Sequence, residues 1–441
     1  MSAESIQTVG VCAVTAARGL RLNVIRSPLE ITLESTGSTW LADWSGHSGA
    51  EAYFDGKLYH STVGYSRLER AIAKRLRDGD KKAVAPYLGA RGDLTEGQYN
   101  ALKGACDSYY SVILGPPGTG KTTLLKHALK RPGTVLLATT GAAAVRIGPS
   151  VCRTVHSGLG FDGKGFTKLI NGASRIFVDE CSMLDETTLM ALLRCNSPIT
   201  FVGDINQLPS VRPGKVLQDL SEILPTFKLT ELLRYEPDSD IGRACAAIMA
   251  GEVPTFGGKF LLDQAEDLCG ISEAAIALSH TAQVSAIDML IMVRTNKERT
   301  EVNDEFGYAY PYPVMNVLNR YRGEGECKSL LLANGEKGMA KKTGISVFKR
   351  GNTSIHFQTD ENIVPAWCCT VQKVQGNQSR GTVIGIGSNL RWDRRLLYTG
   401  VSRSQEWGIV YGNPTAIAAA VANPGADSRI TQIVNLYKEM R

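Results

Sequence analysis

The residues whose types and spacing most clearly indicate a chemical function form a glycine-rich segment at 115–122, Gly-Pro-Pro-Gly-Thr-Gly-Lys-Thr. It fits the pattern GxxxxGK[ST] and lies between an apolar run at 111–115 and a helical stretch, the context that a phosphate-binding loop requires. Backbone N–H groups of such a loop surround phosphates, Lys121 can reach the terminal phosphates, and the hydroxyl of Thr122 can bind Mg²⁺. The sequence therefore predicts a nucleotide site whose binding residues include Gly115, Gly118, Gly120, Lys121, Thr122 and Thr123.

Two carboxylates and an amide follow at the ends of later apolar runs. An Asp-Glu pair is common on protein surfaces, but Asp179 and Glu180 come at the end of an apolar run of the kind that forms a buried strand. A carboxylate there is costly unless it is paired or bound to a metal. An aspartate in this position can hold Mg²⁺, and the adjacent glutamate can polarise an attacking water. The next run ends in Gly-Asp-Ile-Asn-Gln-Leu, so that Gln207 could contact a γ-phosphate.

These residues need a scaffold in which short apolar strands alternate with helices. From residue 94 onward, apolar runs are each followed by Gly, Asp or Thr, which predicts parallel sheets covered on both faces. Two sets of runs predict two α/β domains: 111–115, 134–140, 175–180 and 199–204 in the first, and 289–294, 382–387 and 407–412 in the second. Residues 308–362 are rich in Gly, Tyr, Asn and Lys, so we expect a small β-rich insertion in the second domain.

The first 90 residues say less about function. An amphipathic helix is expected near 66–78, where apolar residues recur every four positions and Arg and Lys fill the other faces. Such a helix usually covers a core with its charges solvated, and a dedicated nucleic-acid contact is the alternative. The segment 89–93 is typical of a linker. We therefore expect an N-terminal accessory domain at 1–90, which could bind a protein partner.

Composition narrows the class of protein. The 441 residues carry 49 Lys and Arg against 43 Asp and Glu, a net charge of +6 that excludes a strongly acidic surface but does not by itself indicate nucleic-acid binding. The ten cysteines form no Cys-x-x-Cys pair, which is typical of reduced thiols in an intracellular protein. We find no signal-peptide pattern and no run near the ~18–20 apolar residues that a membrane span needs. We expect a soluble, cytoplasmic protein without membrane contact.

Taken in order, the motifs resemble those of superfamily 1 helicases, most of all the RecD/Dda branch. The matching segments, besides the phosphate loop, are LTEGQYNAL (94–102), ATTGAAA (138–144), TVHSGL (154–159), VDECSMLD (178–185), GDINQLPSVRPGKVL (203–217), LTELLRY (229–235), NGEKG (334–338), TVQKVQG (370–376) and LLYTGVSRS (396–404). The resemblance covers roughly residues 94–412 in the family's order and leaves the first 90 residues outside it.

The resemblance implies two RecA-like P-loop domains, at 94–228 and 229–441, with an SH3-like insertion at about 308–362. It also implies that the cofactors are ATP and Mg²⁺, that Gln98 contacts adenine, and that Arg234 and Arg403 reach from the second domain to the γ-phosphate. The catalytic residues would be Lys121, Glu180, Gln207, Arg234 and Arg403, with Thr122 and Asp179 as metal ligands.

The candidates for contact with a single strand are Thr140, His156, Thr370 and Gln372, although a local cap or turn is the alternative role for each Thr or His. Gln372 stands where the family has histidine, and Val374 where it often has serine. These departures put in question how strand contact is coupled to ATP. The segment 160–174 has room only for a small hairpin, the expected strand-separating pin, in which Phe161 or Phe166 either forms a wedge or merely packs.

The leading hypothesis is an ATP-dependent helicase that moves on single-stranded nucleic acid, with DNA favoured over RNA, and unwinds a duplex. Two alternatives stay open: an RNA helicase similar to the superfamily 1 enzymes of RNA viruses, and an ATPase switch that binds nucleic acid without unwinding it. The RecD/Dda-like motifs, the short pin and the β-rich insertion favour movement from 5′ to 3′. The branch with the opposite polarity carries large helical insertions in both domains.

Overall fold

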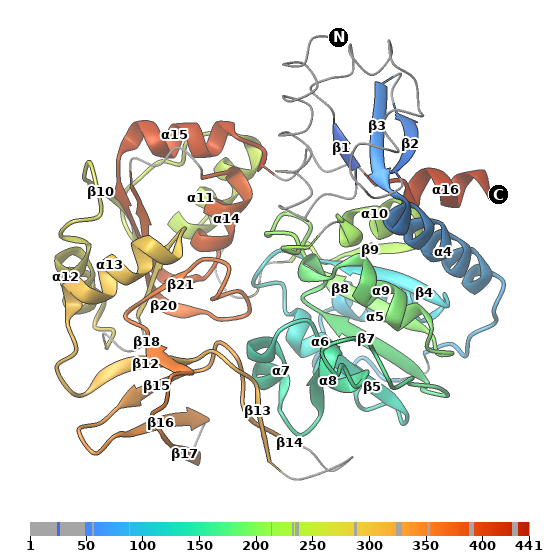
Figure 1. Ribbon diagram of the computed structural model, residues 1–441, viewed down its shortest axis with the longest axis horizontal. Coiled ribbons are helices and arrows are strands. Elements are labelled where there is room, and N and C mark those ends of the chain that lie inside the picture. Colours follow the sequence, from blue (N-terminus) through green and yellow to red (C-terminus); the bar gives the residue numbers. More distant parts are fainter. Residues whose placement is uncertain are drawn as a thin grey trace.

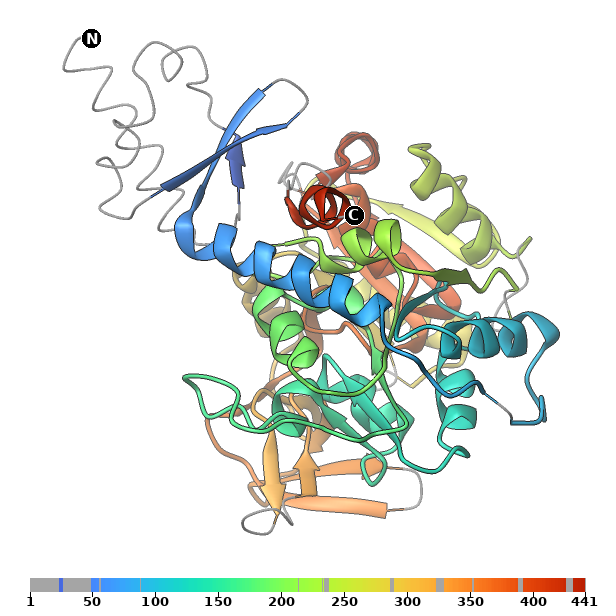
Figure 2. The same ribbon diagram turned by 90° about the vertical axis from the view of Figure 1, so that its right-hand side faces the viewer.

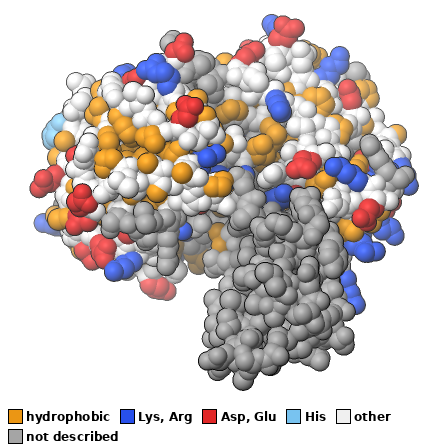
Figure 3. Space-filling view, turned by 90° about the horizontal axis from the view of Figure 1, so that it is seen from above, with side chains coloured by type: hydrophobic (Ala, Val, Ile, Leu, Met, Phe, Trp, Pro, Cys, Tyr) orange, Lys and Arg blue, Asp and Glu red, His pale blue; other side chains and the backbone are white. Residues whose placement is uncertain are grey.

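The chain folds into two lobes that lie side by side, with a smaller β-structure below one of them (Figure 1). The computed structural model describes residues 24–26, 49–54, 57–87, 89–212, 214–231, 233, 238–285, 289–322, 329–350, 353–387, 392–425 and 431–440. Seen from above, acidic and basic side chains are interspersed over both lobes, so this face carries no field of a single sign (Figure 3). No helix of the described ranges is long and apolar enough to cross a membrane.

The first lobe is built on a six-stranded parallel sheet with the strand order β6-β5-β7-β8-β4-β9. The strands are β4 (Tyr110–Leu114), β5 (Thr134–Ala138), β6 (Cys152–Thr154), β7 (Arg175–Asp179), β8 (Ile199–Gly203) and β9 (Thr226–Lys228). Every residue of β4, β7 and β8 is buried, as expected for strands covered on both faces. The predicted parallel sheet is therefore confirmed in this lobe.

Helices cover both faces of this sheet with separate apolar clusters. One cluster joins the strands to α5 (Glu96–Cys106), α6 (Lys121–Ala128) and α7 (Gly141–Ile147). The other joins them to α4 (Val63–Asp80), α9 (Glu186–Leu193), α10 (Val216–Ile223) and α16 (Ile433–Glu439). Alternate residues of β4 serve the two clusters, since Val112 belongs to one and Ile113 to the other.

The packing of α4 and α16 differs from the predicted domain boundaries. Helix α4 lies within the predicted accessory domain 1–90, yet its residues Ile72 and Leu76 are completely buried in the core of the first lobe. Helix α16, which was assigned to the second domain, packs beside α4 on the first lobe (Figure 2). The apolar face of each helix covers the other and the sheet, which removes both faces from water. The first lobe thus contains segments from both ends of the described chain.

Buried acids hold the start of this C-terminal segment. The hydroxyl of Thr431 donates to a carboxylate oxygen of Asp219 at 2.7 Å, and the backbone N–H of Gln432 donates to Glu69 at 3.1 Å. Both carboxylates are fully buried. Upstream of α4, strands β1 (Val24–Arg26), β3 (Lys57–Thr62) and β2 (Gly49–Phe54) form an antiparallel sheet. Most of residues 1–48, and with them much of the predicted accessory domain, lie outside the described residues.

The second lobe contains a five-stranded parallel sheet with the order β10-β21-β20-β11-β19. Its strands are β10 (Phe260–Gln264), β11 (Met289–Val293), β19 (Cys368–Thr370), β20 (Ser379–Ile386) and β21 (Ser404–Gly412). Helices α11 (Asp240–Ala250), α14 (Arg394–Val401) and α15 (Pro414–Ala422) cover one face, and α12 (Ile271–Ala282) and α13 (Asn296–Phe306) cover the other. This sheet also agrees with the prediction.

The segment between α13 and β19 is β-rich, as its composition predicted. Strands β12 (Tyr312–Asn316), β15 (Lys337–Ala340), β16 (Ile345–Arg350), β17 (Thr353–Gln358) and β18 (Ile363–Pro365) form an antiparallel sheet around the buried Phe348. Strands β13 (Arg320–Arg322) and β14 (Ser329–Leu332) pair separately. The SH3-like character of this insertion stays a prediction.

Candidate functional site

The glycine-rich segment forms the loop between β4 and the N-terminus of α6. Gly118 and Gly120 have φ angles of 97° and 76°, in the left-handed region that favours glycine. A Cβ atom on Gly120 would lie 2.2 Å from Nε2 of Gln98, which donates to the Thr119 carbonyl at 3.0 Å. Gln98 is thus packed against this loop, while its predicted contact with adenine stays a prediction. The ammonium of Lys121 donates to the carbonyl of Gly115 at 2.6 Å.

Two adjacent carboxylates face this loop from the end of β7. Asp179 is 1% exposed and Glu180 is 5% exposed, and Glu180 has a left-handed φ of 55°. Burial and the neighbouring charge of Glu180 raise the pKa of Asp179 above its ordinary value. Burial also opposes ionisation of Glu180, but the positive charges of Arg146, Arg403 and Lys121 outweigh it, so the pKa of Glu180 lies below its ordinary value.

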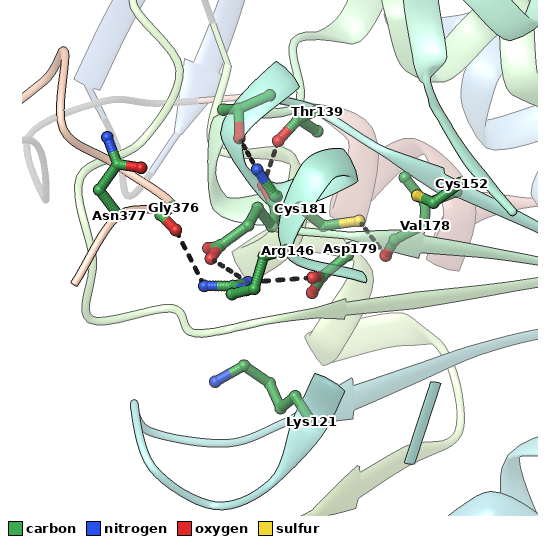
Figure 4. Close-up of polar contacts among 12 residues, drawn as sticks. Lys121, Thr139, Arg146, Cys152, Val178, Asp179, Cys181, Gly376 and Asn377 are labelled. Carbon is green, nitrogen blue, oxygen red and sulfur yellow. Dashed lines mark hydrogen bonds and ion pairs between the residues drawn. The ribbon is translucent and has the colours of Figure 1, made fainter. Parts of the chain in front are cut away.

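Arg146, on α7, is paired with both carboxylates. Its Nη2 lies 3.2 Å from Oδ2 of Asp179 and 3.0 Å from Oε1 of Glu180 (Figure 4). Burial lowers the pKa of Arg146, but the two carboxylates outweigh that effect and hold it above its ordinary value. The site therefore carries a guanidinium that the motif analysis did not include.

The loop after β8 connects the site to the second lobe. Gln207 donates to Asp204 at 3.4 Å, and the phenol of Tyr398, on α14, donates to the same carboxylate at 2.9 Å. The N–H of Leu208 donates to the Thr399 hydroxyl at 3.1 Å. Burial raises the pKa of Asp204 above its ordinary value. Elements of both lobes thus meet next to the phosphate loop.

Arg403 follows α14 and is 2% exposed. Its guanidinium donates to the carbonyl of Thr399 at 3.1 Å and to the Ser402 hydroxyl at 3.2 Å. Burial lowers the pKa of Arg403, and the charge of Glu180 acts in the opposite direction. The other predicted arginine, Arg234, lies outside the described residues.

A cleft of about 250 Å³ brings these groups together. Its lining includes the predicted residues Gly118, Gly120, Lys121, Thr122, Thr123, Glu180, Gln207 and Arg403, together with Pro117, Arg146, Leu233 and Gln378. The first lobe contributes the phosphate loop and the carboxylate, and the second lobe contributes Arg403. Because cations from both lobes surround it, this cleft can accept a polyanion between the lobes.

The residues at the edge of the cleft fit a magnesium ion. Within the described part of the chain, the buried Oδ1 of Asp179 has no hydrogen-bond partner. Thr122, whose side chain carries a hydroxyl, lines the cleft. Carboxylate and hydroxyl oxygens are the hard ligands that Mg²⁺ prefers, usually completed by water and substrate phosphates.

Three of the predicted strand-contacting residues lie around the junction of α7, the loop 370–376 and the insertion. The hydroxyl of Thr140 accepts from Ala143 N–H as the N-cap of α7, and that of Thr370 accepts from Lys373 N–H, so both make the local caps that were the alternative. Gly376 approaches Thr140 so closely that an added Cβ would lie 3.0 Å from its hydroxyl oxygen. Gln372, in the same loop, is exposed.

His156 lies beside the predicted pin. Residues 159–168 form a small hairpin in which Phe161 and Phe166 are paired and Phe161 is exposed. The ring of His156 lies 5.0 Å from that of Phe161 and 5.4 Å from that of Phe166. Burial lowers the pKa of His156, so the neutral ring is favoured in this aromatic cluster.

Comparison with known proteins agrees with these features. The model of the AAA domain matches residues 93–265, and the model of the UvrD-like helicase C-terminal domain matches residues 365–411. The ATP-dependent RecD2 DNA helicase of Deinococcus radiodurans is 29% identical over 423 residues, which cover 85% of this chain. In sequence, the chain is thus similar to superfamily 1 helicases of the RecD type.

Similarity to further helicases extends over most of the chain. The RecBCD enzyme subunit RecD of Mycolicibacterium smegmatis is 25% identical over 414 residues, covering 74% of this chain and 72% of that protein. The crystal structure of Pif1 helicase from Candida albicans shares the fold with a TM-score of 0.51 at 17% identity, covering 79% of this chain and 98% of that one. The chain spans 58% of the length of the Deinococcus relative.

Two features of this site could not be assigned from the motifs. Arg146 carries the only charge in the helix sequence GAAAVRI, which was a usable signal for a special role. The pairing of Tyr398 with Asp204 joins residues 194 positions apart, and no spacing rule indicates it. The structure thus brings the described catalytic candidates together and adds these neighbours.

Proposed function

We propose that the chain is an ATP-dependent helicase that translocates from 5′ to 3′ on single-stranded nucleic acid, preferably DNA, and unwinds a duplex. The observation that carries this proposal is the cleft between the lobes, in which Lys121 and Glu180 of one lobe face Arg403 of the other. The names of the relatives support the choice of DNA, since the Deinococcus protein is called a DNA helicase.

Hydrolysis would depend on charge neutralisation and positioning. The loop N–H groups and Lys121 bind the phosphates, Glu180 orients the attacking water, and Gln207 contacts the γ-phosphate. Thr122 and Asp179 are the residues that would hold Mg²⁺, which neutralises charge on the phosphate oxygens when it is bound. An isolated buried carboxylate would not stay ionised, and the depressed pKa of Glu180 supports its role as an acceptor at neutral pH.

The arginine from the second lobe would complete the site only when the lobes close. Arg403 is now held by carbonyl and hydroxyl groups of its own lobe. A γ-phosphate in the cleft offers this guanidinium charged partners, and contact with it stabilises the transition state. Loss of the γ-phosphate removes that contact, so that the lobes can alternate between two spacings during each cycle.

A basic cavity supports binding of a polyanion near the insertion. It has a volume of about 1170 Å³, and its cationic lining residues are Lys337, Lys341, Lys349 and Arg380. Thr140, His156, Thr370 and Gln372 are the proposed strand contacts at the neighbouring junction, with Phe161 of the hairpin as the proposed wedge. Hydroxyls and cations of this kind contact phosphates without reading base sequence. Residues 1–90 are the proposed site for a protein partner.

An unwinding assay with single-tailed duplexes tests the proposal. With excess ATP and Mg²⁺, a DNA duplex with a 5′ tail should be opened and one with a 3′ tail should not, and the same pair in RNA should be opened less. The variant Lys121→Ala serves as the control, because it removes the cation of the phosphate loop. Opening from a 3′ tail would overturn the polarity, and strand-stimulated hydrolysis without opening of either duplex would overturn the helicase assignment.

A further inference from the structure

The guanidinium of Arg146 connects two parts of the molecule that the proposed cycle must coordinate. Its Nη2 contacts Asp179 and Glu180 at 3.2 and 3.0 Å, and its Nη1 donates to the Gly376 carbonyl at 3.1 Å. The carboxylates end β7 in the first lobe, and Gly376 ends the TVQKVQG loop of the second lobe, 230 residues further along the chain. Figure 4 shows the guanidinium between the carboxylate side and Gly376.

The geometry around Arg146 transmits displacement in both directions. The side chain is only 25% exposed, and the carboxylates it holds are nearly inaccessible, so the pairs cannot readily be replaced by water. Gly376 has a φ of 86° and lies against Thr140 and Ala143 of α7, the helix that carries Arg146. A shift of the carboxylates therefore reaches Gly376 through the guanidinium and through the packing of α7.

The two carboxylates also lie where a bound nucleotide would bring charge, since Glu180 lines the cleft and Asp179 adjoins it. Asp179 has one oxygen engaged by Arg146 and the other, Oδ1, without a partner among the described residues. A magnesium ion bound to Oδ1 would compete for the charge that now holds Arg146, and a γ-phosphate would place further negative charge beside it. Each change alters the balance between the carboxylate and carbonyl contacts of a single guanidinium.

We propose that Arg146 is a positioning residue that couples the nucleotide state of the cleft to the affinity of the TVQKVQG loop for a nucleic-acid strand. The proposal rests on the proposed function, because it assumes that this loop contacts the strand. A planar guanidinium is required, since its fork can donate to the carboxylates and to a carbonyl at once. A lysine ammonium keeps the charge but cannot span both sides in the same way.

Equilibrium binding gives a measure of this coupling that does not depend on turnover. The affinity of labelled oligo(dT) is measured with and without the non-hydrolysable analogue AMPPNP and Mg²⁺, and the ratio of the two dissociation constants is the coupling factor. Couplings between sites are typically ~5–150-fold, and we expect the full-length parent to lie in this range. Both Arg146→Ala and Arg146→Lys should bring the coupling factor to within about twofold of 1, the value that means no coupling.

A matched control separates coupling from general damage. Arg194→Ala removes the same side chain from an exposed position after α9 and should keep the parental factor. A purely structural role for Arg146 would lower both affinities and leave their ratio unchanged, so an unchanged ratio in Arg146→Lys overturns the proposal. A parent that binds neither oligo(dT) nor nucleotide would instead overturn the proposed function, so the two failures are distinguishable.

Discussion

Replacing Asp219 by asparagine tests how the C-terminal segment is held on the first lobe. The carboxylate is fully buried on α10 and accepts from the hydroxyl of Thr431, while the ammonium of Lys215 lies 3.9 Å away. Burial raises the pKa of Asp219 from 3.8 to about 7, against the opposing effects of Thr431 and Lys215. The folded state therefore binds this proton more tightly than the unfolded state does.

The sign and size of the pH effect follow from that difference. The unfolded carboxyl ionises near pH 4, whereas the folded one stays protonated until about pH 7, so stability falls over this interval and is level above it. At 1.36 kcal/mol per pKa unit, the loss between pH 5.5 and 8.5 is about 2 kcal/mol. Asp219→Asn has no such proton, and its free energy of unfolding relative to the parent should rise by about 2 kcal/mol over the same range.

Denaturant unfolding of both proteins at pH 5.5, 7.0 and 8.5, without nucleotide or strand, measures this difference. The control Asp78→Asn changes an exposed aspartate on α4 and should show no pH-dependent difference from the parent. If the difference between Asp219→Asn and the parent is the same at all three pH values, the carboxyl of Asp219 is ionised in the folded protein and the reasoning fails.

Two further substitutions test the cleft itself. Lys121→Ala should lower ATP turnover by at least ~100-fold in a protein with unchanged circular dichroism, because it removes the cation at the terminal phosphates; turnover equal to that of the parent would refute the phosphate-loop assignment. Arg403→Ala should retain nucleotide binding, measured with a fluorescent ATP analogue, and lose turnover by ~10³-fold or more. A collapse of nucleotide affinity with turnover at saturation preserved would make Arg403 a binding residue only.

Much of the fold is predictable from the sequence because its signals are local. The central strands of both parallel sheets contain apolar runs that the sequence marks by the Gly, Asp or Thr at or after their ends, whereas edge strands such as β6 (CRT) and β9 (TFK) carry no such signal. The phosphate loop is equally local, since its glycines are required by left-handed φ angles at Gly118 and Gly120. The positions of Glu180 and Gln207 beside this loop follow because the carboxyl ends of parallel strands meet at one edge of a sheet.

The parts that could not be predicted depend on contacts between distant segments. The apolar faces of α4 and α16 are visible in the sequence, but nothing in either segment specifies that they cover each other, since helix faces are chemically similar. The role of Arg146 as a connection depends on a backbone carbonyl of Gly376, and a carbonyl carries no side-chain signature. Such partners are determined by the packing of whole lobes, which short motifs do not encode.

The docking of α16 also constrains how the lobes can move. Because β9 and α16 belong to the first lobe and the helices α11 to α15 to the second, the chain crosses between the lobes twice. Two crossings oppose separation and leave rotation about the line between them as the easier motion. The contacts across the cleft include four hydrogen bonds, from Tyr398 to Asp204, from Leu208 to Thr399, from Gln375 to Leu208 and from Arg146 to Gly376.

The energies of these contacts favour rotation of the lobes over undocking of α16. A hydrogen bond contributes about 0.5–1.5 kcal/mol net, so the four bonds across the cleft together oppose its rearrangement by about 4 kcal/mol. Nucleotide present at ~1,000 times its dissociation constant contributes about 4 kcal/mol to the state that binds it, which is enough to offset the loss of these bonds. Helix α16 is held instead by an apolar core shared with α4 and the sheet, in which Ile433 is completely buried. Burying one such side chain contributes about 1.5–3 kcal/mol, and Leu436 and Tyr437 add to it. Nucleotide can therefore rearrange the polar cleft while the C-terminal helix stays docked on the first lobe.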